Sequence, residues 1–370
     1  MSVPLFTPFS LRQLTIANRV VVAPMCQYAA DDGSATDWHL MHLGQFCMGG
    51  AALVITEATH VSPEGRISDR CLGLYSDANE AALARVIGFC REHGVAALGI
   101  QLAHAGRKGS THRPRDGGKP LGPDEGAWQT LAPSAEPYAD WPAPRALDAG
   151  GLAMVKAQFV AATERAARIG FDLAELHAAH GYLLHEFLSP LSNRRDDAYG
   201  GSLENRMRFP LEVFEAVRAA WPADKPLGVR VSATDWVDGG WNLEETVTFA
   251  AEIQALGCDF IDVSSGGLHP AQKIAIGPGY QVPFAERIRE ATGLATMAVG
   301  MIREPELANA IVANGQADLV ALARGMMWDP RWGWHAAEAL AAEAPYAPQY
   351  ARCKPETWPL AFANRRAAAE

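Results

Sequence analysis

The strongest pattern along the chain is an alternation between short apolar runs and longer amphipathic segments. Near-continuous apolar runs of strand length are typical of strands that are buried on both faces of a parallel sheet. Eight such runs cover 19–25, 52–58, 97–103, 173–177, 227–232, 260–264, 296–300 and 319–324.

The segments between these runs carry helix start and stop signals. Helices are expected over 77–93, 148–169, 202–221, 242–256 and 304–313. Asp77 is the expected N-cap of the first helix, Gly94 follows its end, and NLEE at the start of the fourth resembles a capping box. A strand–helix unit repeated eight times predicts a single α/β domain folded as a (β/α)8 TIM barrel. A doubly wound open sheet is the competitor, but the chain shows no reversal signal for it.

Three segments fall outside the repeated units. Residues 1–18 are expected to cap the bottom of the barrel. Residues 106–147, rich in Pro, Gly, Asp and Trp, interrupt the unit after the third strand. A structureless insertion of this length is typical of a functional lid. We therefore expect one barrel domain over 1–343, including the lid, and a C-terminal extension over 344–370 that either docks on a neighbouring subunit or frays at its end.

Composition narrows the class of protein. The chain has 370 residues, 49% of them hydrophobic, with a net charge of -10. An acidic chain lacks the basic footprint that nucleic acid requires. No apolar stretch approaches the ~18 residues of a membrane span. Six scattered cysteines without a CxxC pair indicate a reduced, cytoplasmic protein.

Candidate chemistry gathers at the strand ends, where the active sites of such barrels lie. Gly300 would let the backbone approach a phosphate after the seventh strand, and Arg324 after the eighth could bind it bidentately. The alternative is a structural glycine and an arginine in a surface ion pair. Arg230 lies within an apolar strand and needs either a buried partner or an anionic ligand.

The fourth strand ends in His177, His180 and Tyr182. The histidine spacing can hold zinc, but no cluster of further ligands accompanies it, so no metal is expected. Two neutral imidazoles can instead hold a carbonyl oxygen on which negative charge develops, and the phenol can donate a proton. The alternative is a packed core. Cys26 faces the same mouth, although most buried cysteines act as small hydrophobic residues.

These strand ends resemble the Old Yellow Enzyme family of FMN-dependent ene-reductases, and within it the class III, or thermophilic-like, branch. The resemblance covers nearly the whole chain, from about Leu5 to Arg352. The segments that carry it are 23–28 (APMCQY), 101–108 (QLAHAGRK), 177–183 (HAAHGYL), 199–206 (YGGSLENR), 229–232 (VRVS) and 298–302 (AVGMI).

The resemblance implies a non-covalent FMN at the barrel mouth. Within its binding set, Gln101 would bond the pyrimidine edge, Arg230 would face N1 and O2, and Arg324 would hold the phosphate. The whole set is Ala23, Pro24, Met25, Cys26, Ala58, Gln101, Arg230, Gly300, Ala323 and Arg324.

The same resemblance implies how the substrate is held. His177 and His180 would bind its carbonyl oxygen between Tyr28 and Tyr182, and Cys26 would tune the flavin potential and touch the substrate. Relatives in this branch are homodimers or homotetramers in which a C-terminal arginine reaches the neighbour's site, and Arg352 is the candidate here. The chain continues to Glu370, which leaves the position of Arg352 open.

The implied reaction is the reduction of an α,β-unsaturated carbonyl compound by NADPH or NADH with ping-pong kinetics. Hydride reaches the β-carbon, and Tyr182 or solvent protonates the α-carbon. Two alternatives remain. A dienoyl-CoA-reductase-like flavoenzyme would need an iron–sulfur cysteine cluster that the chain lacks. A non-redox phosphate-ligand-binding barrel would leave Tyr182 and the histidine pair without a use.

Overall fold

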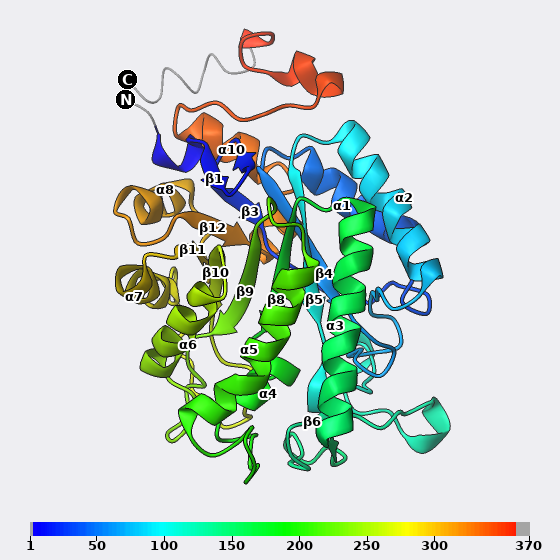
Figure 1. The fold of residues 1–370 in the computed structure, drawn as a ribbon. Coiled ribbons are helices and arrows are strands. Elements are labelled where there is room, and N and C mark those ends of the chain that lie inside the picture. The colour runs from blue at the N-terminus through cyan, green and yellow to red at the C-terminus, as the bar shows by residue number, and fades with distance from the viewer. Residues whose placement is uncertain (1–2, 360–370) are drawn as a thin grey trace.

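Eight parallel strands close into a barrel in the computed structural model, which describes residues 3–359 (Figure 1). Every strand is buried or nearly so, as the apolar runs predict, and each run overlaps one strand. The (β/α)8 barrel is therefore confirmed and the open sheet is excluded. Around the barrel the strands are β3 (Val20–Val22), β4 (Leu53–His60), β5 (Ala97–Ala103), β8 (Leu173–Ala178), β9 (Leu227–Ser232), β10 (Phe260–Ser264), β11 (Ala295–Ala298) and β12 (Leu319–Leu322).

Several strands end earlier than the apolar pattern predicts. β3 stops at Val22, β11 at Ala298 and β12 at Leu322, although the apolar runs continue for two or three residues. After β3 and β11 the remaining residues begin a loop at the mouth, and after β12 they lead directly into the helix that begins at Arg324. The pairing of β4 with β5 also shifts between Ile55 and Ala58, an irregularity that redirects the end of β4.

Helices surround the barrel and cover the outer faces of the strands (Figure 1). All five predicted helices are present to within one residue at each end. Further helices that the sequence analysis did not predict are also present, among them α1 and α7. The helices are α1 (Asp37–Cys47), α2 (Asp77–His93), α3 (Ala149–Ile169), α4 (Leu183–Leu188), α5 (Leu203–Ala220), α6 (Leu243–Ala255), α7 (Val282–Thr292), α8 (Pro305–Ala313), α9 (Arg324–Trp328) and α10 (Trp332–Ala339).

The N-cap of α2 corrects the sequence prediction. Ser76, not Asp77, is the N-cap, and its hydroxyl accepts a hydrogen bond of 3.1 Å from the backbone N–H of Asn79. Asp77 is the first helical residue, with an exposed side chain that pairs with Arg165 at 2.8 Å. The predicted capping box of α6 is confirmed, with Asn242 as the cap.

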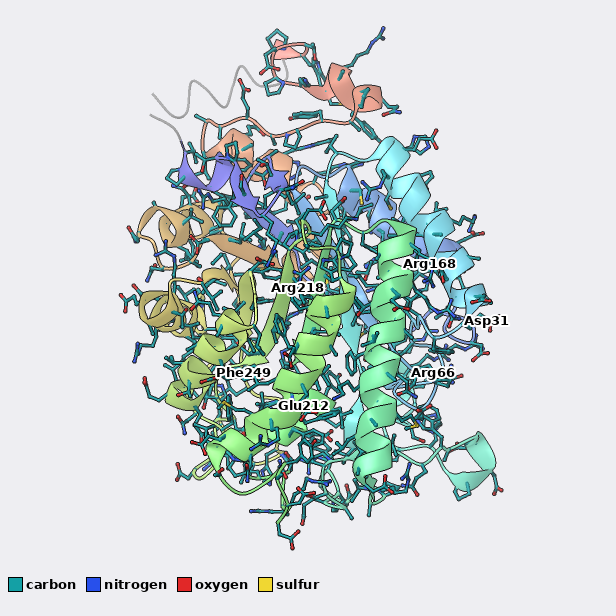
Figure 2. The ribbon with its side chains drawn as sticks, viewed as in Figure 1. Asp31, Arg66, Arg168, Glu212, Arg218 and Phe249 are labelled. Atoms are coloured by element: carbon teal, nitrogen blue, oxygen red, sulfur yellow. The ribbon has the colours of Figure 1, made fainter. Side chains whose placement is uncertain are left out.

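The helical layer carries charged side chains such as Arg168 of α3 and Glu212 of α5 (Figure 2). Glu212 of α5 pairs with Lys156 of α3 at 3.0 Å, whereas Phe249 of α6 is buried against the barrel. None of the helices in residues 3–359 combines the length and the apolar character needed to cross a membrane.

The N-terminal segment closes the end of the barrel opposite the mouth. The hairpin β1 (Phe9–Leu11) and β2 (Leu14–Ile16) places Leu11 and Ile16 against the barrel interior. There they pack in one cluster with Val21, Leu53 and Phe260. The predicted N-terminal cap is therefore present.

The insertion after β5 is not structureless, contrary to the prediction. It contains three short 3-10 turns and the two-residue strands β6 (Leu131–Ala132) and β7 (Arg145–Ala146). The Arg107 guanidinium donates to the backbone carbonyls of Glu136 and Pro137, both at 3.2 Å, and of Leu268 at 3.1 Å. These bonds tie the insertion to the loop after β10.

The start of the C-terminal extension folds back on its own chain, at the same end of the molecule as the N-terminus (Figure 1). Tyr346 stacks on Trp334 of α10 with ring centroids 4.4 Å apart, and Arg331 lies over both Trp334 and Tyr350. Residues 360–370 of the predicted extension lie outside the described residues. Docking of the extension on a neighbour stays a prediction.

Replacing Ser76 by Ala should lower the free energy of unfolding by about 1 kcal/mol, because the N–H of Asn79 loses its acceptor. Asp77→Ala is the matched control. It removes only an exposed ion pair and should change stability by roughly 0.5 kcal/mol or less. Urea unfolding of both variants measures the difference. A larger loss in the Asp77 variant would contradict the capping assignment.

Candidate functional site

The structure brings most of the predicted site residues to one end of the barrel. They lie on, or directly after, the C-terminal ends of the strands, as expected for this fold. Those that follow β3, β11 or β12 are on loops, and Arg324 opens the short helix α9. The residues placed together in this way are Ala23, Pro24, Met25, Cys26, Tyr28, Ala58, Gln101, His177, His180, Tyr182, Arg230, Gly300, Ala323 and Arg324.

His177 and His180 form a hydrogen-bonded pair at the end of β8. Nδ1 of His180 lies 3.3 Å from Nε2 of His177, and Nε2 of His180 lies 2.8 Å from Oγ of Ser264. Burial, and next the positive charge of Arg230, lower the pKa of both imidazoles well below the ordinary value. The pair is therefore neutral, and neutral imidazoles can donate an N–H to a ligand oxygen.

The backbone around the pair fixes how its protons are arranged. The N–H of Ala179 donates to Nδ1 of His177 at 3.2 Å, so the proton of the neutral ring lies on Nε2. His180 has a positive φ of 59°, and its N–H donates to Oγ of Ser232 at 2.9 Å. Gly267 makes this packing feasible, because a Cβ there would lie 2.6 Å from Cα of His180.

Tyr182 packs edge-on against the histidine pair. Its ring centroid lies 5.0 Å from that of His177, with an interplanar angle of 88°. Cys26, Tyr28 and Tyr182 pack together against a small cluster of Ile67, Cys71 and Ala105. Burial raises the pKa of the two phenols and of the Cys26 thiol, so all three keep their protons at working pH.

Lys108, which lies in the predicted insertion, holds the backbone of this corner. Its ammonium donates to the carbonyls of His180 at 2.8 Å and Gly267 at 2.9 Å. The same group lies over the rings of Tyr138 and Tyr182 at 5.0 and 5.1 Å. The insertion is thus attached directly to the residues at the mouth.

The interior of the barrel below the mouth carries charge. Nε2 of Gln101 donates to Oε1 of Glu175 at 2.7 Å, and Nε of Arg230 lies 3.2 Å from Oδ2 of Asp262. Arg230 forms no hydrogen bond within the part of the chain that the structure describes. Of the two alternatives for Arg230, a buried partner is therefore present in Asp262, and the guanidinium still has donors for an anionic ligand.

A cavity of about 850 Å³ lies beside this interior, at the ends of β10, β11 and β12. The cavity is lined both by Gly300 and Arg324, the residues predicted to bind phosphate, and by Ser264, the hydrogen-bond partner of His180. Gly300 has a φ of 130°, and a Cβ there would lie 3.0 Å from Nε2 of Gln281. Among the lining residues are Ser264, Tyr280, Gln281, Val299, Gly300, Ala323, Arg324 and Trp328.

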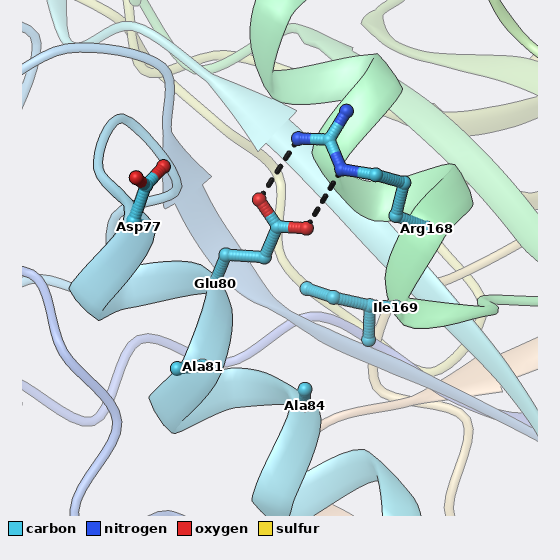
Figure 3. Close-up of a pocket in the computed structure, with 6 residues that line it drawn as sticks. All are labelled: Asp77, Glu80, Ala81, Ala84, Arg168 and Ile169. Atoms are coloured by element: carbon cyan, nitrogen blue, oxygen red, sulfur yellow. Dashed lines mark hydrogen bonds and ion pairs between the residues drawn. The ribbon is translucent and has the colours of Figure 1, made fainter.

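Two features lie away from this mouth. The C-terminal segment that contains the turn Pro348–Cys353 lies at the opposite end of the barrel (Figure 1), and Arg352 in this turn is exposed. A hollow of about 390 Å³ lies between α2 and α3. Glu80 and Arg168, which line it, form an ion pair with two hydrogen bonds (Figure 3). It contains none of the predicted site residues.

Sequence analysis missed Ser264, Glu175 and Asp262. A signal for each was available: Ser264 ends the sixth strand, and the two acids lie within apolar runs as Arg230 does. Applying the argument used for Arg230 to every charged residue in a strand would have found both acids. Within residues 3–359, no three metal-ligating side chains come together.

The closed parallel barrel has a cavity at its C-terminal rim, lined in part by Gly300 and Arg324, and enzymes with this fold often bind a phosphate at that corner. The model of the NADH:flavin oxidoreductase / NADH oxidase family matches residues 4–343. The chain belongs to this family, the Old Yellow Enzyme family that its motifs resemble, and is an FMN-dependent oxidoreductase that takes electrons from a nicotinamide.

Individual relatives agree with this assignment. An NADPH dehydrogenase of Geobacillus thermodenitrificans is 43% identical over 355 residues, covering 95% of this chain and 99% of the relative. The structure of morphinone reductase superposes with a TM-score of 0.76 at 28% identity, covering 95% of this chain and 92% of that one. A 2-naphthoyl-CoA reductase (TM-score 0.83, 24% identity) shares the fold, and this chain spans 53% of its length.

The side chains present fit FMN at both ends of the cofactor. Arg324 is exposed on the cavity wall and forms no hydrogen bond or ion pair with any described residue, so it is free for a phosphate. Arg230, with its uncommitted donors, suits the ring carbonyl that becomes electron-rich on reduction. Bound there, FMN supplies hydride transfer.

The histidine pair should stay neutral throughout the pH range in which the enzyme is stable. Burial and, next, Arg230 lower both pKa values well below the ordinary value for histidine, so neither ring should be protonated at pH 6.5. Nitrogen-detected NMR of the imidazoles, assigned with His177→Asn and His180→Asn variants, measures this. An imidazolium signal at pH 6.5 would contradict the geometry.

Proposed function

We propose that this chain is an ene-reductase, which uses NADPH to reduce the activated C=C bond of α,β-unsaturated carbonyl compounds. The observation that supports this most strongly is the neutral histidine pair with Tyr182 packed against it at the barrel mouth. Nothing in a non-redox phosphate-binding barrel would require this arrangement.

The histidines act on the carbonyl oxygen of the substrate. The Nε2–H of His177 points to Nδ1 of His180 in the free site, and a carbonyl oxygen entering between the rings can accept it. Donation to this oxygen stabilises the negative charge that develops there when hydride reaches the β-carbon. Tyr28 and Tyr182 flank the substrate, and their apolar surroundings exclude water from it.

Tyr182 supplies the proton for the α-carbon. Its raised pKa keeps the phenol protonated at every working pH, and the carbanion-like α-carbon is basic enough to take that proton. In this proposal both substrates use the same mouth in turn, which explains why the sequence needs no separate dinucleotide-binding fingerprint. This predicts ping-pong kinetics.

The flavin contacts are assigned to the residues gathered at the mouth. In this assignment Gln101 and Arg230 bind the ring, and Gly300, Ala323 and Arg324 bind the phosphate. The loop after β3 and Ala58 lie against the ring. Cys26, in that loop, is placed to tune the potential and touch the substrate.

The assembly and cellular setting follow from two further observations. Arg352 is exposed and far from its own mouth, so any contact it makes with a substrate is with that of a neighbouring subunit in a homodimer or homotetramer. All six cysteines are free, which is consistent with a reduced, cytoplasmic protein. The barrel domain is assigned to 1–343, with 344–370 as the extension.

The direct test is the visible spectrum of the purified protein. The protein should be yellow, anaerobic NADPH should bleach it, and cyclohexenone should restore the colour in a single step while the alkene is reduced. Oxygen-free buffer without enone is the control. Bleaching that only oxygen reverses would overturn the enone assignment and leave the flavin assignment intact.

Tyr182→Phe should slow reoxidation by enone by about a hundredfold or more, because the α-carbon loses its proton donor. Reduction by NADPH should stay within about twofold of wild type. Tyr28→Phe is the matched control in the same cluster, and it should weaken substrate binding more than it slows turnover. Stopped-flow absorbance measures each half-reaction separately. Equal loss in both halves for Tyr182→Phe would indicate a structural role instead.

A further inference from the structure

Two carboxyl groups lie inside the barrel, with a single cation between them. Glu175 of β8 and Asp262 of β10 are both 0% exposed, and β9, which separates these strands, carries Arg230. The mechanism above uses Arg230 but neither acid. No carboxyl group in a barrel interior is free of energetic cost, so each needs an explanation.

The two acids have different partners. Asp262 is level with Arg230 in the β9–β10 register and forms the ion pair at 3.2 Å. Glu175 is level with Gln101 in the β5–β8 register and accepts from its amide at 2.7 Å. The second oxygen of Glu175 has no hydrogen-bond partner in the described part of the chain.

The charges in this interior do not balance if both acids are ionised. One guanidinium can neutralise one buried carboxylate, and a second unpaired carboxylate would cost several kcal/mol. A buried acid in this position takes a proton instead. Asp262 has the ion pair, and Glu175 contacts only a neutral amide, so Glu175 is the acid that stays neutral.

We propose that Glu175 holds a proton in the resting enzyme and is a positioning residue for the flavin site: it orients Gln101, while Asp262 alone is the counter-ion of Arg230. This proposal rests on the assignment of Gln101 and Arg230 as flavin contacts. It adds a function for a residue that touches neither the substrate nor the cofactor.

Burial, and next the charge of Asp262, raise the pKa of Glu175 to about 8, against the opposing effects of Arg230 and Gln101. The charged groups that face Glu175 are thus Asp262 and Arg230, and the nearby His177 on the same strand is neutral. Burial also raises the pKa of Asp262, and Arg230 opposes this.

This arrangement couples the proton on Glu175 to the redox state. Reduction adds negative charge near Arg230, which makes ionisation of Glu175 less favourable still. Above about pH 8 the oxidised enzyme holds Glu175 as a carboxylate, and reduction is then accompanied by uptake of one extra proton from solvent. The midpoint potential of the bound FMN should therefore fall more steeply with pH above about 8 than below it.

The test is spectroelectrochemical titration of the FMN-loaded protein between pH 6 and 9. Wild type should show the steeper slope above about pH 8, and Glu175→Gln should lack it. Asp262→Asn should move the pH at which the slope changes to a lower value, because the negative charge of Asp262, which helps to raise the pKa of Glu175, is gone. Glu186→Gln, which changes another glutamate with 0% exposure that is bonded to the N–H of Arg107, should keep the wild-type profile.

If the change of slope in the midpoint potential persists in Glu175→Gln, the proposal is overturned. It is also overturned if Glu186→Gln removes that change of slope. The titration uses no enone, so its outcome is independent of the substrate assignment. Failure of cyclohexenone to reoxidise the flavin would overturn that assignment alone.

If the Glu175→Gln variant does not retain FMN, the proposal can be tested on the apoproteins instead. With its pKa raised above the unfolded value of ~4.3, Glu175 stabilises the fold less as pH rises from about 4 to about 8. Urea unfolding of the apoproteins at pH 5 and pH 8 should show a smaller fall in stability for Glu175→Gln than for wild type. Equal falls would contradict a proton on Glu175.

Discussion

One positive charge inside an apolar barrel governs the chemistry of this protein. Arg230 is only 7% exposed, so its charge must be matched by a negative group, and Asp262 supplies that match at 3.2 Å. Its field lowers the pKa values of His177 and His180 and opposes the rise of that of Glu175. Burial first, and this guanidinium next, therefore keep the histidine pair neutral.

In the proposed reaction, the neutrality of the histidine pair has a chemical purpose. Charged imidazoles would carry their own counter-ions and would hold an oxygen anion too tightly in the ground state as well as in the transition state. Hydrogen bonds to Ser264 and to the backbone of Ala179 instead hold the neutral rings in a fixed orientation, with the Nε2–H of His177 available as a donor. This arrangement favours the charge that appears during the reaction over the charge that is already present.

The barrel and most of the mouth could be predicted from the sequence because both leave local signals. Buried parallel strands give continuous apolar runs, and the fold itself places the ends of those runs together. Side-chain partnerships leave a weaker signal: Asp262 and Glu175 lie within apolar runs, but which one pairs with Arg230 depends on the register of three strands. The Ser76 cap was missed because Ser and Asp are equally good caps and stand side by side. The order within 106–147 was missed because it comes from long-range bonds of Arg107, which no local pattern reveals.

The insertion after β5 has a base that is bonded to the rest of the barrel and a tip that is exposed. Arg107 and Lys108 bind its base to the loop after β10 and to the backbone of His180, whereas its tip, around Pro114–Asp116 and Pro123–Glu125, is mainly solvent-facing. Sequence drift in the tip leaves the histidine geometry intact, because no bond of the pair depends on it. Exchange of this short exposed stretch would therefore leave the bonds that Lys108 makes to the backbone of His180 and Gly267 in place.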